Sequence, residues 1–195
     1  MAKRTDIVTP ERFDSGFTYR DFIAQIKVNE DQFEKYYATA ELSADDIGFF
    51  GRAAQRPNGV GKILVLGEDW CPDVFRGMPV VARIAEATGV EMRVFPRDQN
   101  MDIMNEFLSQ GKFASIPVFV FYTKDLQQIC LWRERPASAN QEREKIEEDI
   151  KNEMPNASES EVRTVIRERI QKKYPAWQKE TIGEMRQMLA EKLGL

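Results

Sequence analysis

The middle of the chain shows clear changes in the spacing of its hydrophobic residues. Residues 63–66 form a short, wholly apolar run, which is typical of a central strand covered on both faces. Apolar side chains then recur at helical spacing from about Pro72 to Thr88, and Gly89 is a suitable helix stop. A second strand is predicted over residues 91–95 and a second helix over residues 101–110. This order predicts two parallel strands joined by a helical crossover.

The next apolar segments predict a hairpin. Residues 118–122 and 128–132 are rich in β-branched and aromatic side chains, and the polar segment 123–125 separates them. A crossover unit followed by a hairpin favours an α/β fold, with helices flanking a central mixed sheet.

Helical periodicity marks both flanks. Three short helices are expected between Thr18 and Gln55, one of them with a capping box formed by Asn29 and Gln32. After Pro136 the chain is rich in charged helix formers, and three more helices with thin apolar stripes are expected, with breaks at Pro155 and Pro175 and a second capping box at Ser158 and Glu161. We therefore expect an N-terminal helical extension (1–60), a core (61–136) and a C-terminal helical extension (137–195) that packs on the core or on a partner.

Composition excludes several classes of function. The chain has 195 residues, 42% hydrophobic and 31% charged, which suits one soluble domain with added segments. It contains no histidine and two cysteines, so Ser-His-Asp and Cys-His catalysis and the common zinc sites cannot be built, and no metal is expected. The net charge of −4 argues against a nucleic-acid partner.

The N-terminal residues and the longest apolar runs bear on localisation. The segment Met1 to Asp6 has two basic residues but no long apolar stretch after it, so it does not resemble a secretory signal. No run approaches the roughly 20 apolar residues that cross a bilayer. We expect a cytoplasmic protein with no membrane association and with reduced thiols.

One position offers chemistry. Cys71 follows the first predicted strand and begins the first core helix, where unpaired backbone N–H groups and the helix dipole favour a thiolate. The carboxylates of Asp69 and Asp73 act against this effect by raising the thiol pKa, so the sequence alone does not give the sign of the net shift. A catalytic Cys71 should have a pKa below about 8.5 and react faster than Cys130.

Three motifs carry a resemblance to a known family. Trp70-Cys71 follows a buried strand, Pro79 lies eight residues after the cysteine, and Ile116-Pro117 opens the third strand. In these features residues 61–136 resemble the thioredoxin superfamily. Through its long N-terminal helical extension, the Glu-Asp-Trp-Cys-x-Asp start at residues 68–73 and the closing segment 132–136, the chain resembles a less studied bacterial branch of thioredoxin-like proteins over about residues 10–136.

The resemblance implies a thioredoxin-like fold and a role for each motif residue. Cys71 would be the nucleophile, and Pro117 would be the cis-proline beside it. The substrate groove would be formed by Trp70, Pro72, Ile116 and Pro117. The acidic residues Glu68, Asp69 and Asp73 are candidates for proton transfer.

Two departures from the family pattern affect the expected activity. Val74 stands where the family has its second cysteine, so a mixed disulfide at Cys71 has no intramolecular route of release. Val65 stands where the family has the buried acid that assists that release. Cys130 is expected to be a buried, inert residue of the fourth strand, too distant to replace the missing thiol.

Three hypotheses follow. The first is a monothiol oxidoreductase that uses Cys71 on a protein or small-thiol substrate, with a low-molecular-weight thiol as reductant and no other cofactor. The second is a redox-inactive protein-binding module of thioredoxin fold that retains Cys71 as a relic. An iron-sulfur carrier is less favoured, because the segment 71–74 lacks the small Cys-Gly-Phe-Ser loop of such proteins. The sequence predicts no oligomeric state.

Overall fold

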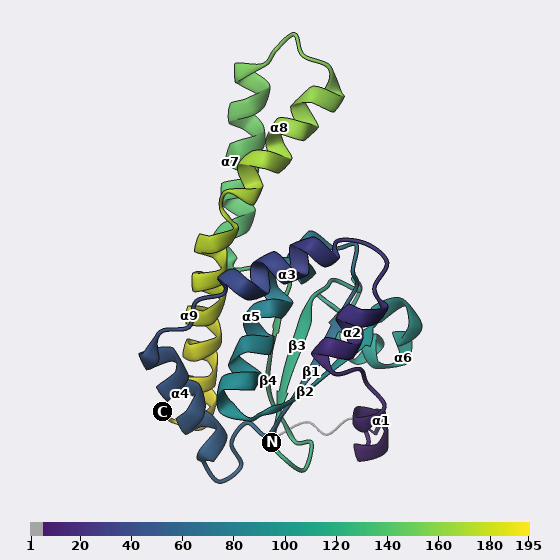
Figure 1. Cartoon of the computed structure of the whole chain (residues 1–195), viewed down its shortest axis with the longest axis vertical. Helices are drawn as coiled ribbons and strands as arrows, with labels where there is room; N and C mark the ends of the chain where they lie inside the picture. The colour runs from purple at the N-terminus through teal and green to yellow at the C-terminus, as the bar shows by residue number, and fades with distance from the viewer. Residues whose placement is uncertain (1–5) are drawn as a thin grey trace.

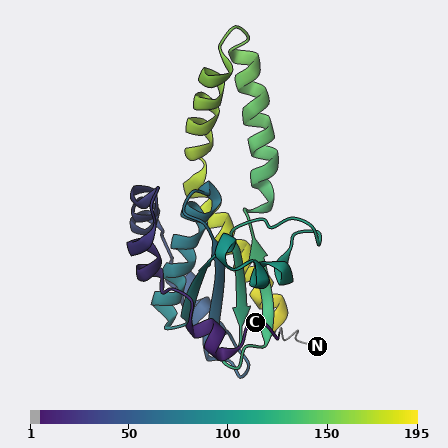
Figure 2. The same cartoon turned by 90° about the vertical axis from the view of Figure 1, so that its right-hand side faces the viewer.

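The computed structural model describes residues 6–195 and is built around a four-stranded mixed sheet (Figures 1 and 2). The strand order is β2-β1-β3-β4. Strand β1 is parallel to β2 and antiparallel to β3, which in turn is antiparallel to β4. The strands are β1 (Lys62–Gly67), β2 (Glu91–Pro96), β3 (Val118–Tyr122) and β4 (Gln128–Arg133). The predicted α/β fold with a central mixed sheet is confirmed. Residues 1–5, most of the segment judged not to be a secretory signal, lie outside the described residues.

The two central strands are buried along almost their whole length. Residues 63–66 of β1 and every residue of β3 are buried. Helix α5 (Pro72–Thr88) follows β1 through a short loop, with Cys71 as its N-cap and Pro72 as its first residue. It ends at Gly89, whose φ of 70° is easily adopted only by glycine. The predicted helix over residues 72–88 is confirmed. Cys71 is thereby fixed at the junction between the buried strand and a long helix.

Helices cover both faces of the sheet. Helix α9 (Tyr174–Leu193) packs against α5 and β4, and α4 (Ala44–Gln55) packs against both of these helices. Helix α3 (Glu30–Thr39) packs on α5. The short helix α6 (Met101–Met104) lies on the other side of the sheet from α9 (Figures 1 and 2).

Two local predictions are wrong. The helix predicted over residues 101–110 ends early: α6 is followed by a 3-10 turn, η2 (Asn105–Phe107), and the chain then becomes extended at Leu108. The turn buries Phe107, whereas Gln110 adopts a φ of 52° that an α-helix cannot contain. The capping box at Asn29 is absent, because Asn29 has a φ of 61° and its side chain instead donates to the Asp69 carbonyl (2.9 Å).

The N-terminal segment is attached to the edge of the sheet. Phe17 forms an antiparallel bridge with Val94 of β2, with hydrogen bonds of 2.9 and 2.7 Å. Helices α1 (Pro10–Asp14) and α2 (Tyr19–Gln25) lie on either side of this bridge. A Cβ on Gly16 would lie 2.6 Å from the Phe95 ring, so only glycine fits at this close approach.

A helical hairpin projects from the domain (Figures 1 and 2). It consists of α7 (Ala137–Glu153) and α8 (Glu159–Gln171), and we call it the arm. The capping box at Ser158 is confirmed. The predicted break near Pro175 is confirmed: α8 ends at Gln171 and α9 begins at Tyr174, with Pro175 in its first turn, where no N–H donor is needed. No helix within residues 6–195 is long and apolar enough to cross a membrane.

Candidate functional site

The candidate site is built around the thiol of Cys71. Its Sγ atom lies 3.9 Å from the carbonyl oxygen of Ile116, and the Ile116–Pro117 peptide bond is cis. Cys71 itself is only 8% exposed, whereas its neighbours Trp70 and Pro72 are exposed. The structure therefore brings the five residues of the predicted nucleophile and groove to one end of the sheet.

Trp70 is held beside the loop that precedes β3. The guanidinium of Arg97 lies over its ring, 5.2 Å from the centroid. The same guanidinium donates to the carbonyl of Ala114 (3.0 Å). Since Trp70 is still 49% exposed, it offers a large aromatic surface to a ligand.

The acidic residues before the cysteine hold loops in place. Glu68 accepts a hydrogen bond from the backbone N–H of Asp98 (2.7 Å). Burial, and to a smaller extent the nearby charges of Asp98 and Asp69, raise the pKa of Glu68. Asp69 accepts hydrogen bonds from the backbone N–H groups of Lys27 (2.9 Å) and Val28 (3.4 Å). The N-terminal extension is thus tied directly to the loop that carries Cys71. Proton transfer by Glu68, Asp69 or Asp73 stays a prediction.

Asp73 belongs to a buried ionic cluster that sequence reasoning missed. Its carboxylate pairs with Arg76 (3.1 Å) and Arg135 (2.6 Å), and Arg76 also donates to the Glu134 carbonyl (3.3 Å). Arg76 is fully buried, and its guanidinium lies 5.6 Å from the ring centroid of Trp177. The i,i+3 spacing of Asp73 and Arg76 at a helix start could have indicated this pair. The third member, Arg135, follows the end of β4 by two residues, and only the fold brings it close.

The surroundings of Cys71 oppose the thiolate form that its helix-start position favours. Burial raises the pKa of Cys71 above its ordinary value, and the charge of Asp73 adds to the effect. The backbone N–H groups of Val74 and Asp73 lower it, and Arg135 does so to a smaller extent, but burial is the largest cause. The helix-start position alone could not show this, because the effect depends on how closely neighbouring segments cover the sulfur atom. Burial thus acts against ionisation of this thiol.

The second cysteine occupies a different part of the sheet. Cys130 pairs with Phe121, three residues along β3 from Val118 at the end nearest Pro117. At about 3.3 Å per residue this places it about 10 Å along the strand from that end. An unmoved disulfide bridges Cα atoms less than about 7 Å apart. Both cysteines are free, and Cys130 is buried as expected.

The loop before β3 carries an unpaired peptide group. The carbonyl of Pro117 accepts a hydrogen bond from the N–H of Glu134 (2.7 Å). Within residues 6–195, by contrast, the N–H of Ile116 has no hydrogen-bond acceptor, and its carbonyl meets only the Cys71 thiol. An unpaired backbone N–H therefore lies next to Cys71 and Trp70, in a residue that is itself only 6% exposed. The described residues contain no group of three or more cysteine or acidic side chains placed to hold a metal ion.

Comparisons with known proteins agree with this geometry. A family model described as thioredoxin matches residues 16–151. The fold is similar to the crystal structure of a protein of unknown function from Pseudomonas aeruginosa (12% identity, TM-score 0.64, 94% of this chain and 98% of that chain covered). It is also similar to the crystal structure of an HIV epitope-scaffold (13% identity, TM-score 0.64, 94% and 99% covered). A search of curated proteins found no match.

Proposed function

The chain belongs to the thioredoxin family, and from that premise we propose that it is a protein-binding module that does not catalyse thiol–disulfide exchange at neutral pH. The observation that carries the proposal is the unpaired backbone N–H of Ile116 beside a thiol that is itself buried. The site thus offers hydrogen bonds for recognition, but little thiolate for reaction.

Recognition at this site follows from the backbone chemistry. An extended segment of a partner can pair with the free N–H of Ile116 in the manner of an added strand, because main-chain hydrogen bonds need no particular side chain. The exposed ring of Trp70 supplies apolar contact next to that strand. Arg97 keeps the ring and the loop together and so preorganises the groove.

Three features speak against catalysis of exchange. The pKa of Cys71 is raised by burial, Val74 replaces the resolving thiol, and the buried acid of the family is replaced by Val65. The raised pKa lowers the fraction of Cys71 that is present as the nucleophilic thiolate. The absence of the second thiol and of the buried acid removes the means of releasing a mixed disulfide.

A second candidate function is monothiol exchange, which the pKa-lowering N–H groups of Val74 and Asp73 favour. In this reaction the Cys71 thiolate attacks a substrate disulfide, a new S–S bond forms at Cys71, and the other substrate sulfur leaves as a thiolate. A low-molecular-weight thiolate then attacks the mixed disulfide, takes over the bound sulfur and restores Cys71. The net result is exchange of one thiol for another in the substrate disulfide.

The two functions are separated by the thiol chemistry. Alkylation by iodoacetamide, followed against pH in a Cys130→Ala background, should give a Cys71 pKa above the value of about 8.5 for free cysteine. Exchange between a glutathione-peptide mixed disulfide and reduced glutathione should proceed at the same rate with the wild-type protein and with Cys71→Ser. A faster, Cys71-dependent reaction would overturn the proposal in favour of the monothiol enzyme.

Binding is tested separately. Partners captured from a cell extract by the wild-type protein should also be captured by Cys71→Ser, and each purified partner should shift the amide resonance of Ile116. If partners are captured through a disulfide bond to Cys71 and are no longer captured by Cys71→Ser, the binding role is contradicted. Replacement of Trp70 by alanine should weaken capture, with Met101→Ala as the control, because Met101 is another exposed apolar side chain.

A further inference from the structure

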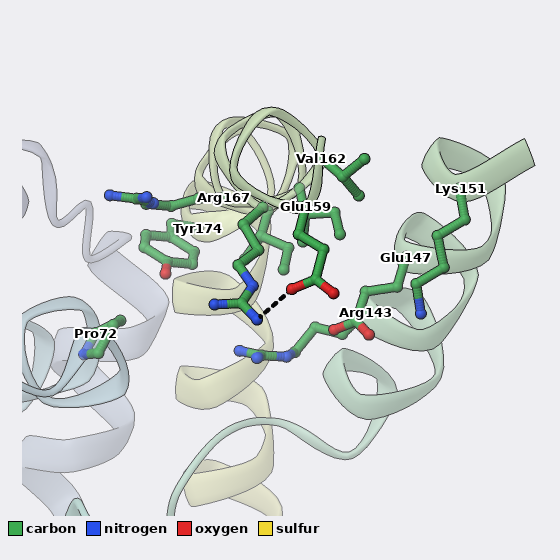
Figure 3. A pocket seen from close by; sticks show the side chains of 11 residues that line it. Pro72, Arg143, Glu147, Lys151, Glu159, Val162, Arg167 and Tyr174 are labelled. Carbon is green, nitrogen blue, oxygen red and sulfur yellow. Dashed lines mark hydrogen bonds and ion pairs between the residues drawn. The ribbon is translucent and has the colours of Figure 1, made fainter. Parts of the chain in front are cut away.

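A cleft runs between the two helices of the arm down to the domain, where it reaches Pro72 beside Cys71 (Figure 3). Its volume is about 520 Å³, within the range of ligand sites. Side chains of α7, α8 and the start of α9 line it, together with Pro72 of α5. Since Pro72 directly follows Cys71, one end of the cleft adjoins the candidate site.

Basic side chains dominate the charge of the cleft. Arg143 and Lys151 of α7 and Arg163 and Arg167 of α8 line it, against two carboxylates, Glu147 and Glu159. The cleft thus has a net charge of +2 (four cations minus two carboxylates) in a chain whose net charge is −4.

Most of these cations are free to meet a ligand. Arg163 pairs with Glu159 (3.1 Å). Within residues 6–195, no side-chain ion pair is found for Arg143, Lys151 or Arg167. Figure 3 shows Arg143 extending from α7 into the space between the helices. An anionic ligand would therefore not have to displace an existing partner at these positions.

The floor of the cleft is apolar. It is formed by α8 and α9 side chains and by Pro72, namely Val162, Ile166, Ile170, Tyr174 and Pro72. An apolar floor below a basic rim suits a ligand that carries both apolar groups and carboxylates.

The spacing of the cations indicates an extended ligand. Arg143 and Lys151 are eight residues apart on one helix, which corresponds to about 12 Å along its axis. An extended polypeptide covers that length in about four residues. A small anion would instead require several cationic groups close to a single point.

From these observations we propose that the cleft binds an acidic segment of the partner protein, with apolar side chains on the floor and carboxylates on the basic rim. This inference rests on the proposed protein-binding function and gives the chemistry of its partner. The arm then serves as a second recognition surface, which reaches the Cys71 site at Pro72.

The test uses a fluorescent synthetic peptide of alternating glutamate and leucine and a matched peptide of lysine and leucine, both without cysteine. The full chain should bind the acidic peptide and not the basic one. The double variant Arg143→Glu/Arg167→Glu should lower the affinity for the acidic peptide by about tenfold or more, because it removes two attractive rim charges and adds two repulsive ones.

A matched control variant shows whether a change in net charge alone alters peptide binding. Lys145→Glu/Lys172→Glu makes the same change in net charge at exposed positions that do not line the cleft, and it should bind as the wild-type protein does. Circular dichroism would verify that both double variants are folded. Equal binding of the two peptides, or equal loss in the two double variants, would overturn the inference. So would a dimer in sedimentation that Arg143→Glu/Arg167→Glu abolishes, because the occupant would then be a second copy of the chain.

Failure of this inference is distinct from failure of the proposed function. If Cys71-dependent exchange is found while the acidic peptide still binds at the arm, only the proposed function fails. If partners shift the Ile116 amide while the acidic peptide does not bind, only the cleft assignment fails.

Discussion

The sheet core and the arm use very different amounts of apolar surface. Five of the six residues of β1 are buried. Helix α7, with 17 residues, buries only Ala139, Ile146 and Ile150, and α8 buries only Ile170. Charged side chains cover most of the remaining arm surface.

This difference separates stability from recognition. Burial of apolar area is the main stabilising contribution to folding, so the sheet and its covering helices should determine the free energy of unfolding. The arm contributes little buried apolar area, so its surface can carry charged side chains that serve binding. We expect changes in the core to alter stability and changes in the arm to alter binding.

The largest effect is expected for a cavity in the central strand. Leu64 of β1 is fully buried, and Leu64→Ala should lower the free energy of unfolding by about 3 kcal/mol. Val162→Ala in the arm should lower it by less than about 1 kcal/mol. Urea unfolding measures both, and equal losses would show that the arm shares the stability of the core.

The second-largest effect is expected at alkaline pH, which should lower the free energy of unfolding. Burial raises the pKa of both thiols in the folded chain, that of Cys130 to about 12. The unfolded thiols ionise from about pH 8.5, so the stability they contribute is complete below that pH. This stability is lost as pH rises further. The loss is about 1.4 kcal/mol per pH unit for each thiol that is protonated in the folded state and ionised in the unfolded state.

Urea unfolding between about pH 8 and pH 10 measures this slope, in a window that ends where tyrosines begin to ionise. Cys130→Ala should make the slope shallower, since one buried thiol is then absent. An unchanged slope in Cys130→Ala would contradict the assignment of the loss to that buried thiol.

A smaller effect is expected at the candidate site. Asp73→Asn removes a negative charge that raises the pKa of Cys71, so the thiolate fraction at pH 7 should increase. The rate of alkylation by iodoacetamide in a Cys130→Ala background should rise by about threefold or more. Asp149→Asn, with the same charge change on the arm, should leave the rate unaltered. If both variants react alike, the ionic cluster does not control the thiol.

The smallest effect is expected for an ion pair on the arm. Glu153 pairs with Arg169 (2.8 Å), and both side chains are exposed to solvent. Water competes for these charges, so Glu153→Gln should leave the thermal midpoint unchanged within error. Calorimetry of this variant beside Asp73→Asn, which leaves the buried Arg76 with less compensation, should show a loss only in the latter. A clear loss in Glu153→Gln would break the separation between core and arm.

Local signals in the sequence predicted the central units well. The apolar run 63–66, the periodicity over residues 72–88 and the stop at Gly89 each depend on neighbouring residues alone, and the structure has the expected elements there. The capping box at Ser158 is equally local. The α/β fold was predictable because these local units follow one another in a characteristic order, and the thioredoxin-like assignment came from the family resemblance of Trp70-Cys71, Pro79 and Ile116-Pro117.

The chemistry of the site was less predictable, since it depends on distant parts of the chain. Asp73 meets Arg135, which lies 62 positions later (135 minus 73), and Asn29 binds the Asp69 carbonyl instead of capping its own helix. The pKa of Cys71 is raised because packing covers its sulfur atom. Sequence reasoning could name these residues but could not state how deeply each would be buried.

The bridge between Phe17 and Val94 has a consequence for self-association. Strand β2 is an outer strand, and an outer strand with free N–H and C=O groups is a template for pairing with another chain. Phe17 occupies both groups of Val94, and the tight approach of Gly16 to the Phe95 ring holds the segment there. The N-terminal extension thereby protects this side of the sheet against edge-to-edge aggregation.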